Sequence, residues 1–129
     1  MASAETLVRV ETENWIFLRV IDGDTIQVRA PFRPLSLSIV SIRLRGADTP
    51  ERGAKAHCDW EQAQAEAATQ FTENFLLRGQ IELRHLAWDK YGGRIDADIL
   101  VNGRSLAKAL IMAELARYYD GSKRPGWCP

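Results

Sequence analysis

One long helix stands between two groups of strands, and its position in their order restricts the fold more than any other feature of the chain. Apolar residues recur at helical spacing after Cys58, with Asp59 as the expected N-cap and Gln62 three residues on, as in a capping box. Gly79 is the expected stop of this helix. We expect its buried face to consist of Trp60, Ala63, Ala67, Phe71 and Phe75.

Three strands are expected before this helix and two after it. The first begins at Leu7 and ends at the turn signal Asp22-Gly23-Asp24. The remaining strands are expected at Thr25–Arg29, Ser36–Arg45, Ile81–Ala87 and Ile95–Val101. A second helix is expected at Ser105–Ala113, and the tail Tyr118–Pro129 should be extended.

This order of elements indicates the fold class. Few β-sandwich topologies place a helix after the third strand, whereas a small barrel of the OB type has such a helix across its bottom. We therefore expect a mainly β protein with some α: a five-stranded OB-fold β-barrel with two to three helices. The 129 residues suffice for a single domain, 1–129, with its core at about 7–119.

The charge balance limits how the chain could bind nucleic acid. It has 17 basic and 17 acidic residues, a formal net charge of zero, so any basic residues that hold phosphate must be concentrated at one site. No apolar run reaches the length of a membrane span, and we expect no membrane partner. Met1–Glu5 shows no signal-peptide pattern, which leaves a cytoplasmic location or, if the chain is processed, a secreted or periplasmic one.

Acidic residues stand at the ends of two neighbouring strands. Asp22 and Asp24 flank Gly23, and Asp48 and Glu51 follow the third strand. If the second and third strands pair, Asp24 and Asp48 lie together, and two carboxylates with a backbone carbonyl and water suit Ca²⁺ or Mg²⁺. No His or Cys accompanies them, which disfavours zinc. Either motif alone is more often a plain turn or loop.

Two arginines are candidates for binding a phosphate. Arg43 lies near the end of the third strand, and Arg94 precedes the fifth. A guanidinium can hold a phosphate at two points and stabilise the charge of a phosphoryl transition state. The commoner fate of a single arginine is an exposed, solvated side chain.

Three blocks together resemble the signatures of the staphylococcal nuclease (thermonuclease) family. They are Val20–Thr25 (VIDGDT), Ile42–Glu51 (IRLRGADTPE) and Asp89–Arg94 (DKYGGR), in the family's order, and the resemblance extends over roughly Leu7 to Tyr119. It implies an OB barrel with three helices. It also implies an endonuclease that hydrolyses DNA and RNA with Ca²⁺ and leaves 3′-phosphates. Base sequence should matter little, because nothing in the chain suggests readout in a groove.

The resemblance implies a site for one Ca²⁺ ion. Asp24 and Asp48 would bind the ion by their side chains, and Thr49 by its backbone carbonyl. Asp22 would lie behind these ligands as a further acid near the metal. Glu51 would be the general base, or would order the attacking water.

The resemblance also implies phosphate contacts. Arg43 and Arg94 would grip the scissile phosphate, and Lys90 and Tyr91 would contact a terminal phosphate of the bound nucleotide. The pair Gly92-Gly93 stands where the best-known member has one glycine, which could displace Arg94.

The C-terminal part departs further from the family. The chain ends soon after Tyr119, so we expect the third helix to be absent or reduced, and only Tyr118 and Tyr119 are candidates for stacking on a base. The resemblance places the first helix near the tail, which makes a disulfide between Cys58 and Cys128 possible. Two free thiols are the alternative, which a cytoplasmic protein would favour.

Two readings compete with a monomeric nuclease whose partner is nucleic acid. Domains of this family without the acids and arginines serve as protein or RNA adaptors, so a catalytically weak binding module is the alternative function. All six key residues stand here, which favours the enzyme. An OB domain that binds single strands by stacking would need aromatic residues on the second and third strands, and these have none.

Overall fold

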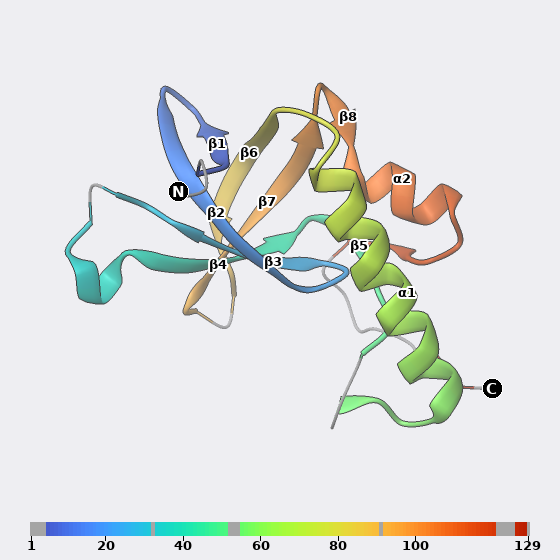
Figure 1. Cartoon of the computed structure of the whole chain (residues 1–129). Helices are drawn as coiled ribbons and strands as arrows, with labels where there is room; N and C mark the ends of the chain where they lie inside the picture. The colour runs from blue at the N-terminus through green and yellow to red at the C-terminus, as the bar shows by residue number, and fades with distance from the viewer. Residues whose placement is uncertain (1–4, 32, 52–54, 91, 121–125, 129) are drawn as a thin grey trace.

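A computed structural model of the chain has a closed β-barrel of six strands among the residues that it describes, 5–31, 33–51, 55–90, 92–120 and 126–128. The strand order is β4-β3-β2-β1-β6-β7, and β4 also pairs with β7, which closes the barrel. Helices α1 and α2 lie on one side of it (Figure 1). The expected OB-type fold, mainly β with some α, is confirmed.

The elements follow one another in an order close to that expected. They are β1 (Leu7–Val10), β2 (Glu13–Asp22), β3 (Thr25–Arg29), η1 (Leu35–Leu37), β4 (Ile39–Leu44), β5 (Gly46–Asp48), α1 (Asp59–Leu76), β6 (Ile81–Trp88), β7 (Arg94–Val101), β8 (Arg104–Ser105), α2 (Leu106–Met112) and β9 (Arg117–Tyr119).

The barrel has one strand more than we expected because the first strand is two. β1 and β2 form an antiparallel hairpin with Val10 opposite Glu13. The reversal between them uses Glu11, whose φ of 56° lies in the left-handed region that glycine or asparagine usually occupies. No Gly, Pro, Asn or Asp stands at this turn, so the sequence carries no signal for it.

Side chains alternate between the two faces of the barrel wall, so core residues point inward and the site residues between them point outward. In β4, Ile42 and Leu44 are buried in the core, while Arg43 between them faces the outer side of the wall. Strand β4 pairs with β3 and β7 so that Arg43 stands opposite Thr25 on one side and Asp96 on the other. Polar side chains of three strands therefore share one outer face.

Helix α1 begins where expected, but its cap and its buried face differ from the prediction. Cys58 is the N-cap, not Asp59, and its side chain makes no capping hydrogen bond. Trp60 is 49% exposed and does not pack in the core. The buried residues of the helix are Glu61, Ala65, Ala68, Thr69, Thr72, Phe75 and Leu76, so of the expected face Phe75 alone is buried.

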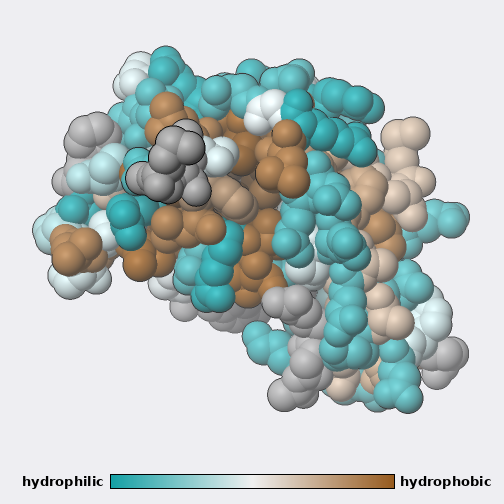
Figure 2. All heavy atoms as spheres, viewed as in Figure 1, coloured by the Kyte–Doolittle hydropathy of each residue, from teal (hydrophilic) through white to brown (hydrophobic). Residues whose placement is uncertain are grey.

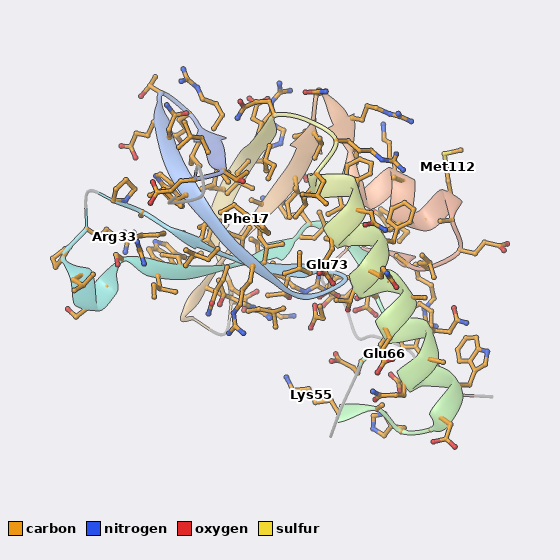
Figure 3. All side chains as sticks on the ribbon, in the orientation of Figure 1. Phe17, Arg33, Lys55, Glu66, Glu73 and Met112 are labelled. Carbon is orange, nitrogen blue, oxygen red and sulfur yellow. A yellow bond between two sulfur atoms is a disulfide. The ribbon has the colours of Figure 1, made fainter. Side chains whose placement is uncertain are left out.

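Small residues replace the expected aromatic stripe because α1 approaches the barrel closely. Thr72 Oγ1 donates a hydrogen bond of 2.7 Å to the carbonyl of Gly23, in the β2–β3 turn. A Cβ added to Gly23 would lie 2.7 Å from Ala68 Cβ and 2.9 Å from Thr49 Cγ2. The solvent face of α1 is hydrophilic (Figure 2), and Glu66 lies on it (Figure 3).

The segment after α2 returns to the site end of the molecule. Strand β9 pairs with β5, with Arg117 opposite Asp48. A disulfide joins Cys128 to Cys58 at the start of α1, with a Cα–Cα distance of 6.1 Å. The described residues after α2 thus contain a strand and a disulfide but no helix. None of the described helices is long and apolar enough to cross a membrane.

The close approach at Gly23 predicts a specific cost for a methyl group there. Gly23→Ala should lower the free energy of unfolding by about 1–3 kcal/mol, because the added Cβ pushes α1 and Thr49 away from the β2–β3 turn. Urea denaturation measures this change. Gly126→Ala is the matched control, since its Cβ would meet no atom within 4 Å. Equal stabilities for the two variants would contradict the close approach.

Candidate active site

The Arg43 guanidinium lies between two buried carboxylates. Its Nη2 is 3.4 Å from Asp24 Oδ2 and 3.3 Å from Asp48 Oδ1. Its Nη1 donates hydrogen bonds to the carbonyls of Leu44 at 2.7 Å and Ala47 at 2.9 Å. The three charged side chains are at most 9% exposed. Charges buried to this degree are stable only when paired and hydrogen-bonded, so these contacts fix the geometry of the site.

Strand pairing brings these residues together. The carbonyl of Asp24 accepts a 2.8 Å hydrogen bond from the backbone N–H of Leu44, at the point where β3 begins beside the end of β4. Asp48 ends β5, the short strand that follows β4 after Arg45. Asp24 and Asp48, 24 positions apart in the sequence, therefore meet at one guanidinium.

Asp24 is further held by the segment that follows β5. Its Oδ2 accepts a hydrogen bond from the backbone N–H of Thr49 at 3.1 Å, and its Oδ1 accepts one from Thr25 Oγ1 at 3.0 Å. Burial alone would raise the pKa of Asp24, but the charge of Arg43 and hydrogen bonds from Asp22, Thr49 and Thr25 hold it below its usual value. Asp24 is therefore ionised at neutral pH.

Asp22 has the opposite character. Burial raises its pKa to about 7, and the negative charge of Asp24, a hydrogen bond with Asp24 and the charge of Glu51 add to the rise. One oxygen of Asp22 accepts the backbone N–H of Asp24 at 3.2 Å. Asp22 thus lies next to Asp24, and it is close enough to Glu51 for the charge of Glu51 to raise its pKa.

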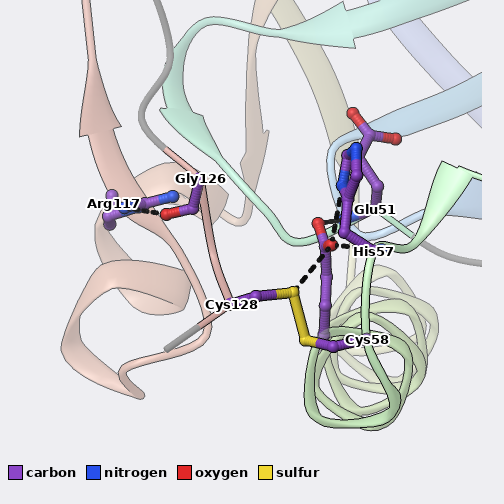
Figure 4. The surroundings of a disulfide bond; sticks show 7 residues. Glu51, His57, Cys58, Arg117, Gly126 and Cys128 are labelled. Atoms are coloured by element: carbon purple, nitrogen blue, oxygen red, sulfur yellow. Dashed lines mark hydrogen bonds and ion pairs between the residues drawn. A yellow bond between two sulfur atoms is a disulfide. The ribbon is translucent and has the colours of Figure 1, made fainter.

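Glu51 stands three residues after Asp48 and is partly buried. Its backbone N–H donates to Glu61 Oε2, on the first turn of α1, at 3.1 Å. Its side chain points away from the disulfide of Cys58 and Cys128 (Figure 4). Contact with α1 therefore fixes the backbone of Glu51, and its charge acts on Asp22 beside Asp24.

Arg94 lies on the same outer face as Arg43. It stands opposite Ser41 in the β4–β7 pairing, two residues along the strands from Arg43 and Asp96, which puts it on the same face. Its side chain is 37% exposed, and its Nε is 3.3 Å from Asp89 Oδ2. The structure therefore brings both arginines to one face, Arg43 buried and Arg94 partly exposed.

The additional glycine does not move Arg94 out of its strand. Gly92 and Gly93 both have a φ of 75°, and the Gly92 N–H donates to the carbonyl of Asp89 at 2.9 Å. The Asp89 N–H in turn donates to the carbonyl of Arg94 at 3.0 Å, which closes the hairpin. The left-handed turn takes up the extra residue. Lys90 is exposed in this turn, and Tyr91 lies outside the described residues.

Asp96 is a site residue that the sequence reasoning missed. Burial raises its pKa, as do a hydrogen bond with Asp89 and the charge of Asp89, while Arg94 and Arg43 lower it in part. The alternation of β7 carried the signal, since Asp96 is two residues after Arg94 and Ile95 and Ala97 are core residues.

The two tyrosine candidates differ in position. Tyr119 lies with its ring centroid 5.5 Å from Arg43 Cζ, in cation–π contact, and is partly buried. Tyr118 is 76% exposed. Tyr119 therefore helps to hold the guanidinium in place, and Tyr118 is the one open to solvent.

The donor set is made of oxygen. Among the described residues, no group of three or more His, Cys, Asp or Glu side chains is placed to hold a metal ion. Asp24 and Asp48 are the two carboxylates that meet, with Thr49 next to them in the chain. Two carboxylates and a carbonyl fit a hard cation that keeps several waters, such as Ca²⁺ or Mg²⁺.

A comparison with protein families gives the same relationship as the sequence blocks. The sequence model of the family described as staphylococcal nuclease homologue matches residues 41–126, more than half of the chain. The chain belongs to the staphylococcal nuclease family. No curated protein matches it. The matched residues include Arg43, Asp48, Glu51 and Arg94, whereas Asp24 stands before them.

The burial of Arg43 predicts that the two arginines differ in their effect on folding. Arg43→Met should lower the free energy of unfolding by about 3–5 kcal/mol, because it leaves Asp24 and Asp48 buried without a cation. Arg94→Met should cost less than about 1 kcal/mol, because its ion pair is partly exposed. Urea denaturation with chelator present measures both. Similar losses would contradict the structural role given to Arg43.

Proposed function

We propose that this member of the staphylococcal nuclease family is a calcium-dependent endonuclease that hydrolyses phosphodiester bonds of DNA, RNA or both. The observation that carries the proposal is the buried cluster in which Arg43 lies between Asp24 and Asp48. A binding module would not need to bury three charges together, since their desolvation costs several kcal/mol per ion. Family membership supports a nuclease relationship.

The metal would be held by oxygen atoms of this cluster and of Thr49. Asp24 and Asp48 would bind one Ca²⁺ ion by their carboxylates, and Thr49 by its backbone carbonyl. Bound there, the ion would supply Lewis-acid stabilisation of the phosphate and a position for the attacking water. The low pKa of Asp24 keeps this ligand ionised, and Asp22 would lie behind it.

The chain's own side chains would do the remaining work. Glu51 would accept or orient the proton of the attacking water, as a general base does. Arg43 and Arg94, on one face, would neutralise charge on the equatorial phosphate oxygens. The water oxygen would bond to phosphorus as the bond to the 5′-oxygen breaks, and that oxygen would take up a proton, giving a 5′-hydroxyl and a 3′-phosphate. Lys90 and Tyr91 would contact a terminal phosphate of the bound nucleotide.

The described residues offer nothing that would read bases in a groove, so cleavage should depend little on sequence. Contacts would go to phosphate and sugar, which positions a strand without selecting its sequence. Tyr118 is the exposed aromatic residue beside the site on which a base could stack.

Cleavage should require Ca²⁺ and an intact Asp48. Labelled single-stranded DNA, duplex DNA and RNA should be cut with Ca²⁺ and left intact with excess chelator. Asp48→Asn keeps the shape but removes one charge beside Arg43, and it should remove most of the activity. Asp59→Asn makes the same change at an exposed position and should cut normally. Undiminished cleavage in chelator would refute the metal, and binding without cleavage would favour the binding module.

Arg94 should contribute through the shape of its guanidinium as well as its charge. Lysine keeps the charge but cannot make the two-point contact with phosphate. Arg94→Lys should lower kcat by a factor on the order of 100 or more, the scale for removing one preorganised donor. Its melting temperature should stay near that of the parent, since the side chain is partly exposed. A kcat within about twofold of the parent for Arg94→Lys and Arg94→Ala would remove Arg94 from the mechanism.

A further inference from the structure

Glu61 is a buried carboxylate outside the set of residues given a role above. It is on the first turn of α1 and is 2% exposed. Oε2 accepts the backbone N–H of Glu51 at 3.1 Å, and Oε1 accepts the backbone N–H of His57 at 2.8 Å, with His57 Nδ1 at 3.2 Å. Both of its oxygens therefore bind the segment that precedes the helix.

These contacts resemble a capping box that has been extended. With Cys58 as N-cap, Glu61 is the third residue of the helix, the position from which a glutamate usually reaches back to the N-cap N–H. Here the carboxylate reaches beyond the N-cap, to His57 and then to Glu51. Glu61 thus binds the segment that follows the site residues Asp48 and Thr49, and not only the N-cap of its own helix.

The two N–H groups that Glu61 accepts come from residues six positions apart. One carboxylate therefore holds both ends of residues 51–57 against α1. On the other side of Glu51, the Thr49 N–H is held by Asp24 Oδ2. Glu51 thus lies in a short segment fixed by one buried carboxylate of the barrel and one of the helix.

The surroundings keep Glu61 charged and in place. Burial alone would raise its pKa, but the N–H groups of His57 and Glu51 outweigh burial and hold the pKa below its usual value. A negative charge in the first turn of a helix is also favoured by the helix dipole. The disulfide lies against it, with Cys128 Sγ 3.7 Å from Glu61 Oε1 (Figure 4).

We infer that Glu61 is a positioning residue for Glu51: it fixes the backbone of Glu51 so that the side chain meets the attacking water. This inference rests on the proposed nuclease function. Glu61 acts through Glu51 and does not touch substrate. Loss of its contacts should therefore lower turnover and leave substrate binding unchanged, because a displacement of a catalytic group of about 1 Å can cost on the order of 100-fold in rate.

The first test measures the kinetics of Glu61→Met in the parent protein and in Glu51→Gln protein. Glu61→Met keeps the side-chain length and removes both acceptor oxygens. It should lower kcat on single-stranded DNA with saturating Ca²⁺ by a factor of about 10 to 100, with KM within about twofold of the parent. In Glu51→Gln protein, Glu61→Met should change the residual rate less than about twofold, since the residue it positions is already lost. An equal loss in both backgrounds would overturn the inference.

Two further variants separate positioning from folding. Glu66→Met makes the same change on the exposed face of α1 and should keep the parental kcat. Glu61→Gln retains one acceptor oxygen and should restore part of the loss. If Glu61→Met does not fold, Glu61→Gln takes its place in both kinetic backgrounds. A parental kcat and KM in folded Glu61→Gln and Glu61→Met would overturn the inference.

Amide hydrogen exchange tests the contact without any assay of activity. The Glu51 and His57 amides should be protected in the parent and exchange faster in Glu61→Met, while amides of the barrel strands stay unchanged. If the parent cleaves no nucleic acid, the nuclease proposal fails, and this measurement then decides the positioning contact alone. Exchange at Glu51 that is equally fast in the parent would overturn the contact.

Discussion

Arg43 places one positive charge against the buried carboxylates of Asp24 and Asp48, and the other parts of the site are arranged around that contact. Removing three charges from water costs several kcal/mol per ion, which is recovered only with good geometry and further hydrogen bonds. The barrel supplies both. Strand β4 holds Arg43 between β3 and β7, and the carbonyls of Leu44 and Ala47 satisfy the second amino group.

The cluster also bears on how a chain without net charge would bind the polyanionic substrate of the proposed function. Two of its basic residues, Arg43 and Arg94, share one outer face of the barrel with Asp96. Asp24, Asp48 and Asp89 also contact these arginines, so the acids outnumber the bases at the site. Burial and neighbouring negative charges raise the pKa of Asp22 and of Asp96. A phosphate approaching such a face is repelled unless a cation is present, which is consistent with the metal in the proposed function.

The sequence predicted the fold class and the proximity of Asp24 to Asp48. Both follow from strand pairing, which the short motifs at the strand ends indicate. The prediction was wrong where a contact between residues far apart in the sequence decides which side chains are buried. The buried face of α1 follows its approach to Gly23, which favours Ala and Thr, so the aromatic pattern misplaced Trp60. The turn at Glu11 lacks a turn residue. Glu61 reads as an ordinary helix-start glutamate until the distant Glu51 is seen at its oxygen.

Two buried carboxylates, one from the barrel and one from α1, hold the backbone of the segment that follows β5. Asp24 accepts the N–H of Thr49 and Glu61 accepts the N–H of Glu51, so both anchors act on backbone N–H groups. One anchor belongs to the barrel and the other to α1. A hydrogen bond from Thr72 to the carbonyl of Gly23 connects α1 to the barrel. The distance between the anchors is therefore set by the packing of α1 on the barrel. The position of the proposed general base thus depends on the small residues at that contact.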